Sequence, residues 1–336
     1  MNINILEKMN KVPGGLIIIP LLVAILINTF APQVLSIGGP TTALFKVGSS
    51  AMMGIFLLIC GTSINIRQAG LPLYKGAVLL FLKCLAGALA VWVAGTLFGP
   101  SGFLGISTLA LIACLTSSNS SLYIALCSNY GDASDAGAIS VFCIKDGPFV
   151  TMMVLGVSGL ANIPFAALLS MLIPLLIGML WGNLDERFKQ LCAAAQPLVI
   201  IIMSFAIGAN SSINTVFTAG LSGILLGIIS ALTGIVFYFI YNLFLKKKSA
   251  LGAALGTTAA SSALTPAMVA QADPSLAMYV DAATAQLATA SIITAPILVA
   301  WFDKRLKKRA PAAEPLKEVK SEESVTLSSP AAKGHK

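Results

Sequence analysis

Ten apolar segments, most of them long enough for a helix to cross a bilayer, fill the first 302 residues. We place them near residues 13–30, 44–62, 76–97, 104–128, 136–157, 164–182, 196–210, 218–245, 251–271 and 276–302. A spanning helix needs about 20 mostly apolar residues to cross the hydrocarbon layer. Only 10% of the residues are charged, against about 25% in a soluble domain. The sequence therefore predicts an all-α polytopic membrane protein with ten transmembrane helices.

The positively charged residues lie in alternate connections between these segments. The connections near residues 31–43, 98–103, 158–163 and 211–217 have no charged residue. The opposite set carries the cations, which are Lys8, Lys11, Arg67, Lys75, Arg187, Lys189, Lys246, Lys247, Lys248, Lys304, Arg305, Lys307, Lys308 and Arg309. Because Lys and Arg stay on the cytoplasmic side of a membrane, this alternation predicts that both termini are cytoplasmic. Residues 303–336, rich in Pro, Ser, Glu and Lys, are expected to form a disordered cytoplasmic tail.

The residue inventory excludes several classes of function. His335, the single histidine, lies next to the end of the chain, and the six cysteines form no Cys-x-x-Cys pair. We therefore expect no metal site, no cofactor and no histidine-based catalysis, so the chain is not predicted to be an enzyme. The basic residues lie at the ends of apolar segments and not on one soluble face. This placement excludes nucleic acid as the main partner and leaves membrane lipid.

Four short patterns occur twice, in the same order and roughly 150 residues apart. The sequence IPLL stands at residues 19–22 and 173–176, and SIN stands at residues 63–65 and 212–214. The polar run at residues 116–121 corresponds to residues 257–262, and residues 146–148 correspond to residues 294–296. Each copy holds five spans, an odd number, so the second copy must cross the membrane in the opposite direction. We therefore predict two inverted five-helix repeats, at residues 1–157 and 158–302.

The fourth and ninth spans are the least hydrophobic, and we predict that both helices are broken. Residues 116–121 are all polar and cannot face lipid, because their donors and acceptors would have no partner there. The ninth span is interrupted by Gly252, Gly256 and Thr265-Pro266. Broken helices at matching places in inverted repeats are typical of secondary transporters, where freed helix ends bind substrate and ions. The alternative is a bundle whose duplication has no functional role and whose small residues only allow close packing.

We expect the substrate to contact both breaks. The candidate substrate-binding residues are Ser117, Ser118, Asn119, Ser120, Ser121, Ser261, Ser262 and Thr265. Asn65, Asn210 and Asn214, at the ends of the second and seventh spans, are weaker candidates. They either line the site or cap a helix end.

Apart from Lys46 at the start of the second span, four charged residues lie inside the predicted spans, where charge is costly and usually functional. Asp146 precedes Gly147-Pro148, where the helix is expected to kink, and is the candidate proton carrier. Lys145 is a candidate for substrate binding, and because adjacent helical residues do not face each other, one of this pair is expected to face elsewhere. Lys83 either neutralises Asp146 or a substrate carboxylate, or extends to the membrane interface. Asp281, near the outer end of the tenth span, is a weaker candidate.

A set of motifs lies in order between residues 11 and 185, within a resemblance that extends over about residues 8–305. These motifs are KVPGG at residues 11–15, NSSLY at 119–123, Tyr130-Gly131 with DAGA at 135–138, Gly147-Pro148 with Thr151-Met152, and GNLD at 182–185. Together they resemble the bacterial 2-keto-3-deoxygluconate permeases. The resemblance implies a ten-span, bile-acid/sodium symporter-like fold in the inner membrane and proton-coupled import of a sugar acid from pectin breakdown. It also adds Tyr123 to the candidate substrate-binding residues.

Two positions depart from the pattern of that family. The family has an acidic residue near Thr116, where this chain has none, and it has Glu-Ser-Gly-Pro where this chain has Lys-Asp-Gly-Pro at residues 145–148. We therefore expect a secondary active transporter that imports 2-keto-3-deoxygluconate by proton symport. The alternative is sodium-coupled or proton-coupled import of another small hydroxylated carboxylate.

Overall fold

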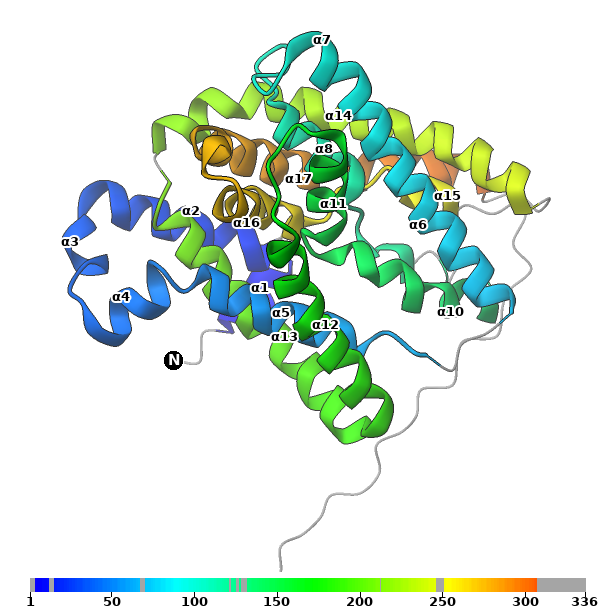
Figure 1. The fold of residues 1–336 in the computed structure, drawn as a ribbon, viewed down its shortest axis with the longest axis horizontal. Helices are drawn as coiled ribbons and strands as arrows, with labels where there is room; N and C mark the ends of the chain where they lie inside the picture. Colours follow the sequence, from blue (N-terminus) through cyan, green and yellow to red (C-terminus); the bar gives the residue numbers. More distant parts are fainter. Residues whose placement is uncertain are drawn as a thin grey trace, which may run out of the picture.

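The computed structural model describes residues 4–11, 15–66, 70–120, 122–124, 127, 132–211, 213–245 and 251–306, which form helices joined by short connections (Figure 1). Within these ranges there is no β-strand. Among the described residues, five helices are long and apolar enough to cross a membrane. Two bent pairs bring this number to as many as seven: α4 (Gly39–Phe45) with α5 (Ser49–Thr62), and α10 (Ala133–Phe142) with α11 (Phe149–Ser158). The chain is thus a multi-pass membrane protein, as predicted.

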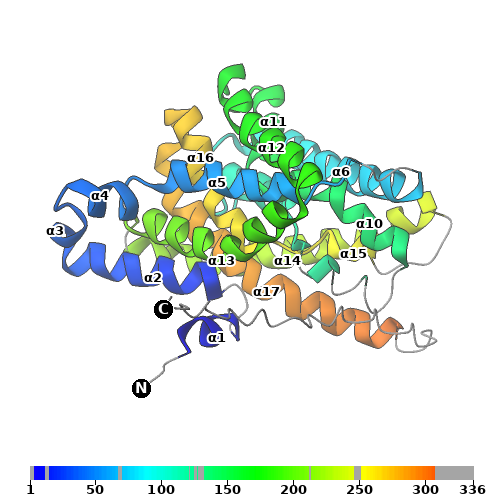
Figure 2. The same cartoon turned by 90° about the horizontal axis from the view of Figure 1, so that it is seen from below.

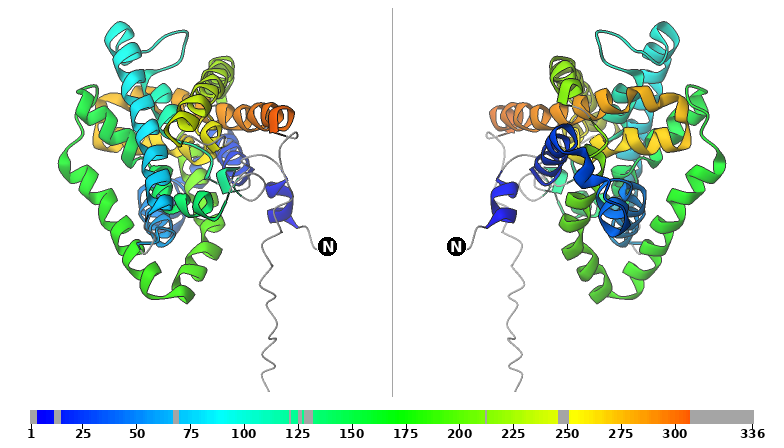
Figure 3. Two further views of the ribbon diagram at one scale, coloured as in Figure 1. Left: turned by 90° about the vertical axis from the view of Figure 1, so that its right-hand side faces the viewer. Right: turned by 90° about the vertical axis from the view of Figure 1, so that its left-hand side faces the viewer.

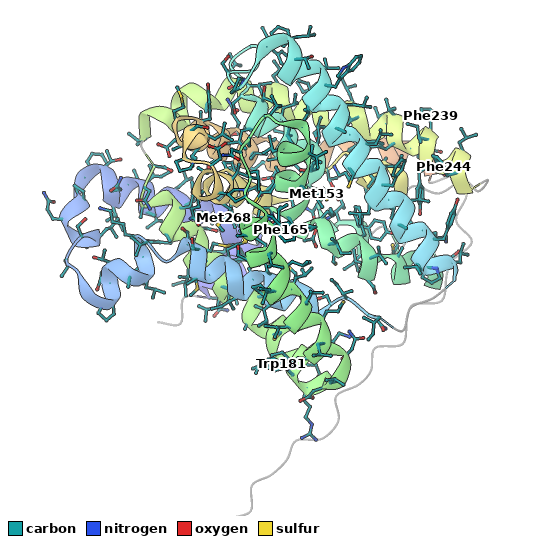
Figure 4. All side chains as sticks on the ribbon, viewed as in Figure 1. Met153, Phe165, Trp181, Phe239, Phe244 and Met268 are labelled. Atoms are coloured by element: carbon teal, nitrogen blue, oxygen red, sulfur yellow. The ribbon has the colours of Figure 1, made fainter. Side chains whose placement is uncertain are left out.

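Large apolar side chains cover the outside of the long helices. Phe165 and Trp181 on α12 (Phe165–Leu184) are 78% and 48% exposed. Phe239 and Phe244 on α14 (Ile213–Leu245) are 56% and 49% exposed. Figure 4 labels these four side chains on the ribbon. Such a surface is unfavourable in water and favourable in hydrocarbon, which agrees with a membrane location.

Four helices form one group, which we call the helix panel: α2 (Gly15–Phe30), α5, α12 and α13 (Glu186–Gly208). Helix α12 lies against α5, and α13 lies against both α2 and α5. Helices α12 and α13 form a hairpin, which Figure 3 shows as a green V at the lower edge of the helical body. The panel therefore pairs helices from the first half of the chain with helices from the second half.

The other long helices form a second group, which we call the core bundle. Its members are α6 (Leu71–Ala90), α8 (Thr108–Thr116), α10, α11, α14, α15 (Leu251–Ala254), α16 (Thr265–Ala272) and α17 (Val280–Leu306). Helices α15 and α17 pack on α14, and α8 and α10 pack on α6. In Figure 2 the panel helices α2 and α5 extend to the left, and α6, α10 and α15 extend to the right. The remaining short helices are α1 (Ile5–Asn10), α3 (Pro32–Leu35), the π-helical η1 (Val91–Gly95), α7 (Thr96–Phe98) and η4 (Pro274–Tyr279).

Both predicted helix interruptions are present in the core bundle. Helix α8 ends at Thr116, and the backbone of Ser117 is extended, with φ −96° and ψ 161°. Helix α15 ends at Ala254, and the chain becomes helical again only in the 3-10 helix η3 (Ala260–Leu264) and α16. Ser and Thr hydroxyls compete for backbone hydrogen bonds and so weaken a helix. Pro266 lies in the first turn of α16, where its missing N–H costs nothing.

Two predicted helix boundaries are wrong. Helix α13 begins at Glu186 and not near residue 196, because the Asp185 carboxylate caps it by accepting the backbone N–H groups of Arg187 and Phe188. The charged residues predicted as a connection are therefore the first turn of a helix. Helix α14 begins at Ile213, so the predicted connection 211–217 is also largely helical.

Gly61 and Gly208 are two of the glycines that allow the panel helices to touch. A Cβ atom at Gly61 of α5 would lie 2.1 Å from the carbonyl oxygen of Leu175 on α12. A Cβ atom at Gly208 of α13 would lie 2.3 Å from the carbonyl oxygen of Leu21 on α2. Both distances are far below van der Waals contact, so any side chain at either position must push two backbones apart.

We expect Gly61→Ala to destabilise the protein by about 1–3 kcal/mol, because it overpacks the contact between α5 and α12. Gly54 on the same helix is the matched control, since a Cβ atom there meets nothing within 4 Å. Gly54→Ala should leave stability unchanged or raise it by about 0.5–1 kcal/mol. Thermal unfolding of the detergent-purified variants measures both effects. Equal melting temperatures for the two variants would contradict this account of the panel.

Candidate functional site

The two helix interruptions meet at one place, which we call the crossing (residues 116–120 and 256–260). The backbone N–H of Asn119 donates a hydrogen bond of 2.9 Å to Thr257 Oγ1. The Cys114 thiol and the Thr258 hydroxyl lie 3.0 Å apart. Thr257 and Thr258 are fully buried. Each interrupted segment therefore satisfies polar groups of the other in the interior of the core bundle.

A charged pair lies beside the crossing on the 3-10 helix η2 (Cys143–Asp146). The Lys145 ammonium contacts the Asp146 carboxylate and donates hydrogen bonds of 2.7 Å to the Ser118 carbonyl and 2.8 Å to the Ser120 hydroxyl. The Ser120 hydroxyl lies 2.7 Å from both carboxylate oxygens of Asp146. The structure thus brings four predicted site residues into one network.

The expectation that Lys145 or Asp146 faces elsewhere is wrong. Both side chains reach Ser120, because the flexible lysine side chain folds back from the last turn before Gly147. The break in the neighbouring helix also supplies a free carbonyl, at Ser118, that an intact helix would not offer. Rotation about the helix axis alone therefore does not decide which side chains pair.

Three polar groups near the crossing have no hydrogen-bond partner in the part of the chain that the structure describes. They are the Lys83 ammonium on α6 and the hydroxyls of Ser117 and Ser118. Lys83 is completely buried, so it does not extend to the membrane interface. Lys83 lies close enough to Lys145 for their positive charges to repel each other. Because an unpaired buried polar group costs free energy, this set is suited to receive a polar ligand.

The second break contributes fewer free groups. Ser262 is buried, and its hydroxyl donates to the Ala259 carbonyl at 2.7 Å. Thr265 is buried at the start of α16, and Ser261 is partly exposed. Helix η3, which carries Ser261 and Ser262, contacts α2 and α13, while η2 contacts α5. The helix panel therefore reaches the core bundle at the segments that carry the candidate site.

Several predicted candidates lie away from the charged pair. The Tyr123 hydroxyl donates to the Asp135 carbonyl at 2.9 Å. Asp281 accepts a hydrogen bond of 3.1 Å from Ser211 and, with Asn210, lines a separate cavity of about 380 Å³ between panel and core. Asn65 follows the end of α5, consistent with a position at a helix end. Ser121 and the side chain of Asn214 lie outside the described residues, as does most of the predicted tail.

A second buried ion pair was missed by the sequence analysis. The ammonium of Lys75, at the start of α6, lies 2.5 Å from the Asp135 carboxylate and 3.2 Å from that of Asp132. Lys75 and Asp135 are both about 3% exposed. Asp132 and Asp135 form a capping box at the start of α10, and their spacing is the signal that would have predicted it. The pair ties α6 to α10 and lies apart from the crossing.

Thr151 and Thr294 were also missed. The hydroxyls of Thr116 and Thr151 lie 2.7 Å apart, and Thr294 Oγ1 accepts the backbone N–H of Thr258 at 3.1 Å. Thr294 corresponds to Asp146 in the predicted repeat, so the repeat alignment already pointed to it. No group of three or more His, Cys, Asp or Glu side chains able to hold a metal ion occurs among the described residues.

A family model described as 2-keto-3-deoxygluconate permease matches residues 6–308. The chain belongs to this family. It is 41% identical to 2-keto-3-deoxygluconate permease 1 of Salmonella typhimurium over 311 residues, which cover 91% of this chain and 98% of the relative. It is 32% identical to 2-keto-3-deoxygluconate permease of Bacillus subtilis over 316 residues, which cover 91% and 96%. The resemblance predicted from the motifs is thereby confirmed.

Within this member of the family, we expect Ser120→Ala to lower stability by about 1.5–3 kcal/mol, because it removes a hydroxyl bonded to two charged groups. Ser170→Ala is the control, since the Ser170 hydroxyl is exposed and donates to Ala167 of its own helix. Its effect should stay within about 0.5 kcal/mol. The measurement is thermal unfolding in detergent. If Ser120→Ala unfolds at the same temperature as Ser170→Ala, the network does not support the crossing.

Proposed function

We propose that this chain is a secondary active transporter that imports 2-keto-3-deoxygluconate by proton symport. The relatives it matches carry the name 2-keto-3-deoxygluconate permease, which supports the substrate. The observation that carries the proposal is the buried crossing, with two ammonium groups and one carboxylate beside it and with two hydroxyls that have no partner among the described residues. Permeases move a solute without changing it, so the proposed activity is transport and not catalysis.

The charges of the site suit a monovalent anion. Lys83, Lys145 and an ionised Asp146 together carry one net positive charge in a buried place, where an anion of one negative charge balances it. The substrate carboxylate would accept hydrogen bonds from Lys83 and from Ser117 and Ser118, which lack other partners among the described residues. Sugar hydroxyls would then contact Ser261, Ser262 and Thr265 at the second break.

Proton coupling follows from the same charges. Protonation of Asp146 removes a negative charge beside the substrate carboxylate and therefore strengthens anion binding. By linkage, the bound anion strengthens proton binding at Asp146 by the same factor. The Asp146 side chain is 15% exposed, whereas that of Lys145 is 0% exposed. The small exposed part of the carboxylate would give a proton a route to it.

The contacts of the helix panel support the proposed inverted repeats at residues 1–157 and 158–302. The contact of Gly61 with Leu175 has its counterpart in the contact of Gly208 with Leu21, and Leu21 and Leu175 occupy equivalent places in the repeated IPLL motif. A second matched pair joins helix ends: Asn28 donates to the Ser211 carbonyl at 3.3 Å, and Asn183 donates to the Ile64 carbonyl at 2.7 Å.

We propose ten spans, which the matched contacts support through the repeat, and both termini in the cytoplasm of a bacterial inner membrane, which the alternating cations support. Movement of the core bundle against the helix panel would then expose the crossing to each side in turn. In this scheme α8 with its continuation and α15 with α16 are the broken fourth and ninth helices. Broken helices of this kind cross a membrane only where neighbouring protein satisfies their backbone groups.

We expect cells that express this chain to accumulate radiolabelled 2-keto-3-deoxygluconate, and a protonophore to abolish the accumulation. Asp146→Asn should reduce proton-driven uptake to background, because an amide cannot carry the proton. Asp185→Asn is the matched control, since asparagine also caps a helix and should keep α13 and uptake intact. Protonophore-sensitive uptake by Asp146→Asn would rule out this residue as the proton carrier. Dependence on sodium in the wild type would favour the sodium-coupled alternative.

We expect Lys83→Gln to raise the KM for uptake about ten- to hundredfold, since a hydrogen bond to a charged group contributes about 1.5–3 kcal/mol. The control is Lys46→Gln, because Lys46 is partly exposed and its ammonium bonds to Ser36, outside the site. Initial rates of uptake at increasing substrate concentration give both values. An unchanged KM in Lys83→Gln, with the protein confirmed in the membrane, would remove Lys83 from the substrate site.

A further inference from the structure

The Lys145 ammonium lies in a cage of oxygen atoms. Its partners are a backbone carbonyl at Ser118, a hydroxyl at Ser120 and a carboxylate at Asp146. The carbonyl comes from the interrupted segment after α8, and the carboxylate comes from η2. Carbonyl, hydroxyl and carboxylate oxygens are the ligands that hard metal cations prefer, and unwound backbone carbonyls coordinate Na⁺ in transporters.

All hydrogen-bond donors of the Lys145 ammonium have partners. An ammonium has three N–H donors, and Lys145 has three oxygen partners for them. Its side chain is completely buried, and the ring of Phe142 lies 4.5 Å from the nitrogen. The Lys145 ammonium thus has the oxygen and ring contacts that a bound metal ion would have, although this cation is part of the chain.

Lys83 is buried like Lys145 but differs from it in its hydrogen-bond partners. Both lysines are buried, but the Lys83 ammonium has no hydrogen-bond partner in the described ranges. Burial alone therefore does not give a lysine oxygen partners. Lys75 is also buried among oxygens, but they belong to side chains at the start of α10, whereas the partners of Lys145 include a backbone carbonyl from an interrupted helix. The Lys83 ammonium is thus free to bind a ligand, whereas the Lys145 ammonium occupies the place that a bound cation would take.

We propose that the Lys145 ammonium occupies a monovalent-cation site, so that the wild-type chain binds no Na⁺ there, and that removal of the ammonium exposes a site for Na⁺. The proposal goes beyond the proposed function, because it concerns a metal ion and holds without any substrate. It makes Lys145 a permanent counter-cation for Asp146 at the crossing. The cage without the ammonium would keep its three oxygens and gain room for an ion with its waters.

The test uses the full-length protein in detergent, without substrate, and compares thermal unfolding in NaCl with unfolding in choline chloride at equal concentration. The wild type should unfold at the same temperature in both salts. Lys145→Ala should be stabilised by Na⁺ by several degrees in a saturable way, because a ligand that binds only the folded state raises the melting temperature. The double variant Lys145→Ala with Asp146→Asn should lose this effect, because the cage loses its negative charge.

Lys83→Ala is the matched control, and it should show no difference between the salts. The proposal is overturned if Na⁺ stabilises the wild type over choline, or if folded Lys145→Ala unfolds at one temperature in both salts. If Lys145→Ala fails to fold, Lys145→Thr replaces it, since threonine adds one more oxygen to the vacated cage. The outcome is independent of sugar-acid uptake, so failure of the proposed function and failure of this inference are distinguishable.

Discussion

The interior of a bilayer offers no hydrogen-bond partners, so every backbone group that an interrupted helix releases must be satisfied inside the protein. In this chain two interruptions meet, and the Thr257 hydroxyl in one accepts the backbone N–H of Asn119 in the other. The remaining carbonyl at Ser118 accepts from Lys145, which in turn pairs with Asp146. The need to satisfy the released backbone thus brings charged groups into the centre of the core bundle, and the candidate site results from this requirement.

The helix panel has the opposite character. Its helices touch closely at Gly61 and Gly208, where backbone meets backbone, and its outer surface is apolar. It reaches the core bundle at η2 and η3, beside the interrupted segments. A panel that holds together through close backbone contacts, next to a core with a polar centre, is suited to the relative movement that we propose for transport.

The sequence predicts the polar centre well, because six consecutive polar residues have no place against lipid. It also predicts the family, through motifs between residues 11 and 185. It does not predict the Lys145–Asp146 contact. Helical periodicity gives the direction in which a side chain leaves the helix, but not where a long, flexible lysine side chain ends. It places the start of α13 about ten residues too late, because hydropathy registers the charged first turn as a connection and does not weigh the cap at Asp185. The Lys75–Asp135 pair is not predicted, because the sequence argument uses lysines in connections only to assign the cytoplasmic side and does not look for their partners.

The central claim is that the crossing binds the sugar acid together with a proton. The most direct measurement is the pH of a weakly buffered suspension of proteoliposomes that contain the purified protein, recorded while 2-keto-3-deoxygluconate is added. We predict that the external medium becomes more alkaline as the substrate enters, and that Asp146→Asn abolishes this change. Substrate entry without any change in external pH, in the wild type, would contradict the account.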